Sequence, residues 1–214
     1  KYDKPAPFED TTPTTKLVKI PMSQHIGAPA TPIVAVGDSV LKGQKIAEAG
    51  GFVSAPIHAS VSGTVKKIEP RRVPTGDMVN SIVIESDGEF KEVEYQAVED
   101  VSALSKEEII NRIKEAGVVG MGGAGFPTHV KLSPKEPEKI DYIIANCAEC
   151  EPYLTSDYRI MLDHTEELVE GMRIILSMFE HAKGVFAVEN NKPDCIAKLL
   201  ELTKDEPRME VAPL

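Results

Sequence analysis

Hydrophobic and polar positions divide the chain into two stretches with different periods. From about residue 16 to residue 85, short apolar and β-branched runs are separated by turn signals rich in Gly, Pro, Asp and Ser. We expect strands at residues 17–20, 33–36, 45–47, 53–55, 63–68 and 81–85. Short runs bounded by turns in this way are typical of a small all-β unit.

From residue 105 onward the apolar positions repeat at helical spacing or form short strand-like runs. Ser105 and Glu108 make a capping box that begins a helix at Lys106, and Gly117 ends that helix. The remainder predicts a strand at residues 140–145, a helix from residue 163 or 165 to about 179, a strand at 184–189, a helix at 193–200 and a strand at 209–212. This order favours a parallel, doubly wound half-sheet.

We divide the chain on these patterns. Residues 1–15 form a proline-containing arm, 16–86 the β unit, 87–104 an acidic linker and 105–214 the first half of an α/β domain. The chain does not begin with Met and stops in what reads as the middle of a domain. We therefore expect it to be a fragment.

Composition narrows the function classes. The 214 residues are 42% hydrophobic and 27% charged, which is ordinary for a globular protein. The net charge of −10 argues against nucleic acid as a partner, because that binding depends on Lys and Arg. No apolar run is long enough to span a bilayer and no secretory leader opens the chain, so we expect a soluble intracellular protein without a transmembrane segment.

The stretch richest in candidate chemistry is a glycine loop that contains Gly120, Gly122, Gly123 and Gly125. Backbone N–H groups that no side chain covers form a cradle for anions such as phosphate. The spacing fits the dinucleotide-binding pattern G-x-G-x-x-G, but that pattern requires a strand before it and a helix after it. Here a helix precedes the loop, and Pro127 interrupts any immediate helix after it. On the pattern alone, a nucleotide loop and a tight packing loop remain equal alternatives.

The sequence that follows the glycines adds further evidence for a nucleotide site. The run Gly-Gly-Ala-Gly-Phe-Pro-Thr at residues 122–128 is followed by Lys131, then by Asn-x-x-Glu-x-Glu-Pro at residues 146–152 and by Asp157. This resembles the flavin- and NADH-binding subunit of respiratory complex I. It is more similar still to the C subunits of the Rnf (Rsx) electron transport complex, a family whose members share Asn-x-Ala-Glu-Cys-Glu-Pro-Tyr and a segment like residues 20–85.

The resemblance implies binding of FMN and NAD(H). It assigns the flavin and its phosphate to the backbone around Gly120, Gly122, Gly123 and Gly125. The side chains that it adds to the cofactor site are Phe126, Lys131, Asn146, Glu149 and Glu151. Lys131 and Asn146 would hydrogen-bond the cofactor, the carboxylates would accept hydrogen bonds from ribose or the nicotinamide amide, and Phe126 would stack on a ring.

The sequence differs from the complex I motif at two positions, and both differences change polar contacts at this site. Met121 stands where that family has arginine, and Ala148 where it has aspartate. The Rnf motif Asn-x-Ala-Glu-Cys-Glu-Pro-Tyr accounts for the alanine at position 148. No catalytic side chain is expected, because the flavin supplies the hydride chemistry and the protein positions it.

The β unit resembles biotinyl and lipoyl carrier domains, which implies a barrel-sandwich hybrid followed by a Rossmann-like sheet. A carrier needs a lysine at its hairpin tip, and Gly50 and Gly51 occupy that place here. We expect the carrier fold without carrier chemistry. His25 and His58 are interpreted as turn or surface histidines and Phe52 as a packing residue.

Cys147 and Cys150 have the spacing of a redox or metal pair, but no further ligand run accompanies them and Cys195 stands apart. We interpret the pair as buried structural cysteines beside the cofactor that hold no metal. The resemblance implies that the [4Fe-4S] clusters of the full subunit lie beyond Leu214.

Taken with the resemblance, the sequence predicts an electron-transfer subunit of a membrane-associated ferredoxin:NAD oxidoreductase coupled to ion translocation. The implied partners are the other Rnf subunits, NAD(H) and, through the complex, ferredoxin, and the implied location is the inner face of the cell membrane. We expect this piece alone to hold no FMN tightly and to show no NADH dehydrogenase activity. A non-catalytic docking module of a redox complex is the alternative, and Gly50 and Gly51 disfavour an acyl carrier.

Overall fold

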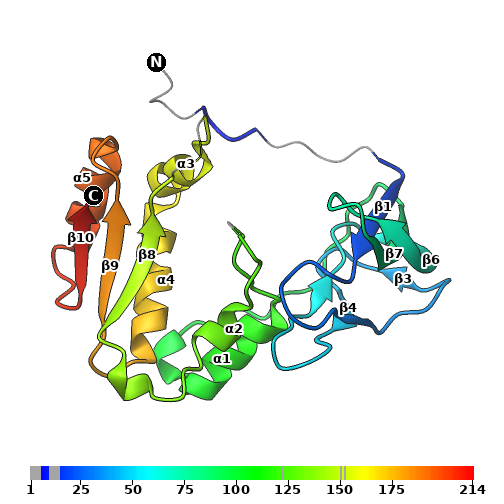
Figure 1. Ribbon diagram of the computed structural model, residues 1–214, viewed down its shortest axis with the longest axis horizontal. Helices are drawn as coiled ribbons and strands as arrows, with labels where there is room; N and C mark the ends of the chain where they lie inside the picture. Colours follow the sequence, from blue (N-terminus) through cyan, green and yellow to red (C-terminus); the bar gives the residue numbers. More distant parts are fainter. Residues whose placement is uncertain (1–5, 10–14, 122, 150, 152) are drawn as a thin grey trace. The chain divides into compact units, whose positions relative to one another are not determined.

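The computed structural model describes residues 6–9, 15–121, 123–149, 151 and 153–214. Contacts group the chain into two compact units, one of residues 12–134 and the other mainly of residues 135–214 (Figure 1). We call them the β-sandwich unit and the α/β unit. The domain boundary expected within residues 87–104 stays a prediction from composition, since contacts place the first helix and the glycine loop in the same unit as the β strands.

The β-sandwich unit has two antiparallel sheets, with strand orders β1-β7-β6-β3 and β2-β4-β5. The strands are β1 (Leu17–Pro21), β2 (Thr31–Pro32), β3 (Ser39–Val40), β4 (Lys45–Glu48), β5 (Ile57–His58), β6 (Gly63–Arg72) and β7 (Met78–Ser86). Side chains from both sheets fill one core that includes Met22, Ile46, Val65, Ile82 and Ile84. Burying them supplies the main stabilisation of so small a unit.

Two of the expected strands are not strands. Residues 33–36 and 53–55 lie in loops, and the short strands of this region are β2 and β5 instead. Val34 packs partly against the core and Ala55 is buried, so apolar residues of the connecting loops contribute to the core as the strands do. In a sandwich of two-residue strands, an apolar run therefore does not distinguish a strand from a buried loop.

The hairpin tip between β4 and β5 has no room for a carrier side chain. A Cβ atom on Gly50 would lie 2.0 Å from the Pro29 carbonyl oxygen, a distance at which backbone must move. Phe52, at the same tip, is 78% exposed, so the expectation that it packs inside the unit is wrong. The tip keeps the carrier topology while its sterics disfavour a lysine at this position.

Two helices follow the strands in this unit after a short 3-10 turn, η1 (Val101–Ala103). They are α1 (Lys106–Glu115) and α2 (Thr128–Lys131). The predicted capping box is confirmed, with Ser105 and Glu108 each accepting from the other's backbone N–H. The expectation that Pro127 prevents an immediate helix is wrong. Pro127 is the N-cap of α2, where a missing N–H breaks no helical hydrogen bond.

The α/β unit is a three-stranded parallel sheet in the order β10-β9-β8. Its elements are the 3-10 turn η2 (Pro137–Lys139), β8 (Tyr142–Cys147), α3 (Ser156–Asp163), α4 (Thr165–Ser177), β9 (Lys183–Val188), α5 (Pro193–Thr203) and β10 (Met209–Pro213). The parallel half-sheet expected from the alternating pattern is confirmed. Helix α3 was not expected, because its eight residues carry only a weak apolar stripe.

Helices α4 and α5 lie on one face of this sheet, behind the strands in Figure 1. The packing is close, because a Cβ atom on Gly184 of β9 would lie 2.6 Å from the Met172 sulfur of α4. On the opposite face Tyr142 and Ile144 of the edge strand β8 are 55% and 64% exposed. The strand expected at residues 140–145 is therefore present as β8, with one of its faces exposed.

Candidate functional site

The glycine loop is a closed hairpin between α1 and α2. Gly117, at φ +68°, ends α1 as expected. Val119 and Pro127 then form an antiparallel bridge, and the Gly120 N–H donates to the Phe126 carbonyl at 3.0 Å. Backbone pairing at its base fixes where the loop emerges.

The loop is also attached to the segment between β1 and β2 in its own unit. The Ile26 N–H donates to the Ala124 carbonyl at 2.9 Å. The neighbouring His25 is buried, and its Nε2 lies 3.1 Å from the Ala55 N–H nitrogen and 3.2 Å from the Ala55 oxygen. His25 is therefore a buried residue in a bend, which fits the turn alternative and not the surface one, whereas His58 is half-buried.

The described glycines of the loop differ in what surrounds them. Gly125 has φ +64°, and a Cβ atom there would lie 3.0 Å from the Gln24 oxygen, so the fold itself requires glycine. A Cβ atom on Gly120 would lie 3.4 Å from the Lys131 Nζ. At Gly123 nothing lies within 4 Å of a Cβ position. Gly122 lies outside the described residues.

These surroundings fit a phosphate group. Gly123 has exposed backbone that no neighbour requires to be bare, and the Lys131 ammonium lies next to the loop at Gly120. A cation beside exposed glycine backbone is a donor set that suits an anion. Phe126 is 36% exposed, which leaves part of its ring open to solvent.

The second group of predicted residues lies at the end of β8 and in the loop that follows it, in the α/β unit. Asn146 is exposed, and its Oδ1 accepts from the Ala148 N–H at 3.2 Å, which begins a tight turn. Cys147 is buried as expected, and burial raises the pKa of its thiol to about 11. Glu151 is exposed. Cys150 lies outside the described residues, so its predicted role stays a prediction.

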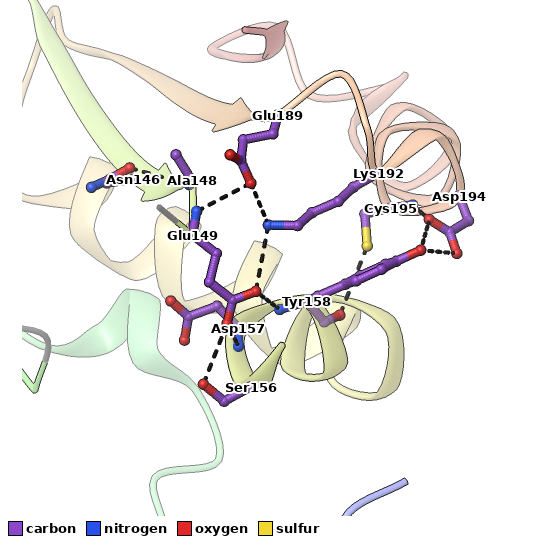
Figure 2. Close-up of polar contacts among 10 residues, drawn as sticks. All are labelled: Asn146, Ala148, Glu149, Ser156, Asp157, Tyr158, Glu189, Lys192, Asp194 and Cys195. Atoms are coloured by element: carbon purple, nitrogen blue, oxygen red, sulfur yellow. Dashed lines mark hydrogen bonds and ion pairs between the residues drawn. The ribbon is translucent and has the colours of Figure 1, made fainter. Parts of the chain in front are cut away.

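Glu149 behaves differently from Glu151, as Figure 2 shows. Its side chain is only 5% exposed, and its carboxylate accepts from the N–H groups of Asp157 at 2.8 Å and Tyr158 at 3.2 Å. These N–H groups belong to the first turn of α3, where Thr155 provides no side-chain cap. The carboxylate predicted to bind a ligand thus caps a helix in this structure.

Two residues that the sequence did not single out complete this cluster. The Lys192 ammonium lies 2.6 Å from Glu189 Oε2 and 3.4 Å from Glu149 Oε2 (Figure 2). The ammonium lowers the pKa of the Glu189 carboxyl, and the Glu149 N–H donates to the same carboxylate at 3.3 Å. The sequence did contain a signal for Glu189, because this residue directly follows β9, at the sheet edge where ligands bind in α/β folds.

The described residues contain no group of three or more His, Cys, Asp or Glu side chains placed to hold a metal ion. Within the same ranges, none of the helices has the length and apolar character that crossing a membrane requires.

The glycine loop with Lys131 belongs to the β-sandwich unit, and Asn146, Glu149 and Glu151 belong to the α/β unit. Each group is thus built within its own unit. Within the α/β unit Asn146 lies near the end of β8, and Glu149 and Glu151 follow in the next loop. Within the β-sandwich unit Gly120 and Lys131 are neighbours.

Two protein families match the chain, one over its N-terminal part and the other over its C-terminal part. Residues 3–89 match the family described as the RnfC barrel sandwich hybrid domain. Residues 113–214 match the Nuo51 FMN-binding domain. The second match contains the glycine loop and the loop after β8, which are the two segments singled out by sequence.

Curated relatives resemble both parts together. The C subunit of the Na(+)-translocating ferredoxin:NAD(+) oxidoreductase complex of Acetobacterium woodii is 46% identical over 200 residues, which are 92% of this chain and 44% of that protein. The C subunit of the proton-translocating complex of Clostridium ljungdahlii is 46% identical over 92% of this chain and 43% of its own length. The C subunit of the ion-translocating oxidoreductase complex of Haemophilus influenzae (strain PittEE) is 40% identical over 84% of this chain and 28% of its own length. The chain thus spans less than half the length of these relatives.

Solved structures are less similar. The NAD+-reducing [NiFe]-hydrogenase in its H2-reduced state aligns with 52% of this chain and 21% of its own chain, at 24% identity and a TM-score of 0.43. This is below the similarity at which a shared fold follows.

Proposed function

Because this chain belongs to the family of C subunits of ion-translocating ferredoxin:NAD(+) oxidoreductase (Rnf) complexes, we propose that it is the part of such a subunit that binds FMN and NAD(H). When bound, FMN exchanges hydride with nicotinamide and passes on single electrons. The chain itself binds and orients the cofactors.

Gly123 is the residue that supports FMN binding most directly. The fold places no atom against it, so the absence of a side chain there has no use in packing and leaves backbone open to a ligand. The Lys131 ammonium beside Gly120 supplies the positive charge that a phosphate requires. We assign the phosphate to Gly120, Gly122, Gly123 and Gly125, with Lys131 as its cation.

In the α/β unit, further cofactor contacts are assigned to exposed polar groups at the end of β8 and in the loop after it. Glu151 accepts hydrogen bonds from ribose hydroxyls or the nicotinamide amide, and the Asn146 amide hydrogen-bonds the flavin. Phe126 stacks on an aromatic ring of the ligand with the part of its ring that is exposed. Glu149 belongs to the site through its place in this loop, while its carboxylate is engaged inside the protein.

We further propose that the whole subunit transfers electrons between NAD(H) and ferredoxin, with ion translocation in the other subunits of the complex. Its [4Fe-4S] clusters would then belong to sequence outside these 214 residues. Such a subunit would lie against the inner face of the cell membrane. The functions named for the relatives from Acetobacterium woodii and Clostridium ljungdahlii support this assignment.

A docking role between subunits without cofactor is the competing function. The exposed Tyr142 and Ile144 on one face of β8 favour it, because a parallel sheet is ordinarily covered on both faces. The open backbone at Gly123 favours cofactor binding instead, since docking alone does not require it.

Titration of FMN and NADH into the full-length protein that contains this sequence separates the two functions. Gly123→Val places a branched side chain in the open space and should abolish FMN binding without unfolding the protein. Gly171→Ala, in α4 and also with open space around it, is the matched control and should bind FMN normally. Full-length protein that binds neither FMN nor NADH would favour the docking role.

A further inference from the structure

Lys192 is a buried cation at the start of α5. Its side chain is 6% exposed, and its ammonium lies between the carboxylates of Glu189 and Glu149 (Figure 2). The ammonium also lies 5.7 Å from the centre of the Tyr158 ring, within the range of a cation–π contact. A lysine is rarely buried to this extent unless its charge is paired.

The contacts of Lys192 lead to the loop after β8. Glu189 accepts from the backbone N–H of Glu149, and the Glu149 carboxylate accepts from the first turn of α3. Glu149 is therefore fixed at its backbone by one partner of Lys192 and at its side chain by α3 and by Lys192 itself. Glu149 thus connects the loop after β8 to α3 and to the residues that follow β9.

The charges show why the cation matters. Without Lys192, the carboxylates of Glu149 and Glu189 would lie near each other with no positive partner among the described residues that contact them, and Glu149 would be a buried, uncompensated charge. Removing one member of a buried pair is strongly unfavourable for this reason. Glu149 would then turn toward solvent, and the loop that carries Glu151 would lose its anchor.

We propose that Lys192 and Glu149 are positioning residues, a buried ion pair that holds the loop after β8 so that Glu151 faces the dinucleotide. This role rests on the proposed function for its ligand, and on the contacts of Lys192 for its geometry. Neither side chain needs to touch the ligand, because the Glu149 carboxylate is already engaged by α3.

Lys192→Met in the 214-residue chain tests the anchor by hydrogen exchange without any ligand. We expect the amides of Glu149, Asp157 and Tyr158 to exchange at least about tenfold faster, because opening of the loop is no longer opposed by the pair. The matched control is Lys198→Met on the same helix, which removes a bond from Nζ to the Leu162 carbonyl at the far end of α3. Equal exchange at these amides in both variants would overturn the proposal.

NADH titration of the full-length protein adds the test of ligand positioning. Lys192→Met should weaken NADH binding by about tenfold while Lys198→Met does not, and Glu149→Gln combined with Lys192→Met should recover part of the loss because no unpaired charge remains. Glu149→Gln that weakens binding by itself with unchanged amide exchange would show direct ligand contact and overturn the positioning role. Wild type that binds no NADH would refute the proposed function, and the exchange experiment would still decide whether the pair anchors the loop.

Discussion

At the scale of single residues, the same residue type serves opposite purposes in one loop. Gly125 is a requirement of folding, since its positive φ and its contact with Gln24 exclude a side chain. Gly123 has neither constraint. Sequence alone cannot separate the two, because both are glycines in one motif, and only the surrounding atoms show which of them leaves backbone open for a ligand.

Alanine substitution should separate these roles. We expect Gly125→Ala to lower the free energy of unfolding by about 1–2 kcal/mol, the cost of forcing a Cβ into the left-handed region. Gly123→Ala should change it by less than about 0.5 kcal/mol. Denaturant unfolding of both variants measures the difference, and equal losses would mean that Gly123 also has a structural role.

The buried thiols should be inert in the native protein. Burial raises the pKa of Cys147 to about 11 and that of Cys195 to about 12, so neither forms the reactive thiolate at neutral pH. In a Cys150→Ser variant, a thiol reagent should modify neither cysteine until the chain is unfolded. Rapid labelling of either one in the folded protein, detected by mass spectrometry, would contradict this.

At the scale of elements, local signals in the sequence were reliable and long-range contacts were not. The capping box at Ser105 and the proline at the first position of α5 act over a few residues, so the sequence contains everything that they need. The attachment of Ala124 to Ile26 joins residues far apart in sequence, and no local pattern encodes it.

In the candidate site, too, local features could be predicted from the sequence and long-range contacts could not. The glycine loop and the loop after β8 were predictable as segments, because their composition is unusual. The engagement of Glu149 by α3 was not, because α3 itself has a weak pattern and Lys192 reads as an ordinary helix-start lysine. Burial of both side chains becomes visible only when β9 and α5 are placed beside β8.

Helix α2 and strand β5 carry histidines whose titration should affect the β-sandwich unit. Burial lowers the pKa of His129 and of His58 from the ordinary value of 6.5, and the charge of Lys114 adds to the effect at His129. At a pH between the lowered values and 6.5, these histidines therefore bind protons in the unfolded chain but not in the folded unit. Stability is complete above about pH 6.5 and is lost as the pH falls through the lowered folded values.

Hydrogen exchange of the β7 amides, corrected for intrinsic rates, measures the loss of stability of the β-sandwich unit between about pH 7.5 and about pH 5.5. The loss should be smaller in His129→Gln. His181→Gln, an exposed position in the other unit, should leave it as in wild type. If His129→Gln shows the full wild-type pH dependence, another group is responsible.

At the scale of the whole molecule, the contacts of the glycine loop extend the β-sandwich unit beyond the boundary that composition predicts. The buried residues of the core, such as Met22, Ile46, Val65 and Ile84, lie within residues 16–86, which favours independent folding of that piece, and Phe90 packs against them from outside it. Residues 105–134 add backbone contacts, the Lys45–Glu115 ion pair at 2.7 Å and buried side chains such as Ile109 and Leu132. They stabilise the unit without being necessary for its core.

We therefore expect two separately expressed chains, residues 16–86 and residues 15–134, both to fold, with different stabilities. The longer chain should melt at least about 4 °C higher, since about 1 kcal/mol shifts the melting temperature of so small a unit by that amount. Part of the gain should come from docking of the loop, because a Cβ atom on Gly117 would lie 2.6 Å from the Pro56 oxygen and Ala124 accepts from Ile26. The rest should come from residues 90–93, where Phe90 packs on the core and the backbone pairs with Lys42. Gly117→Val in the longer chain should then remove part of the difference, whereas Gly76→Val, at a turn with open space, should affect both chains equally. Identical melting temperatures for the two unmodified chains would mean that the glycine loop gains its order from something other than the β strands.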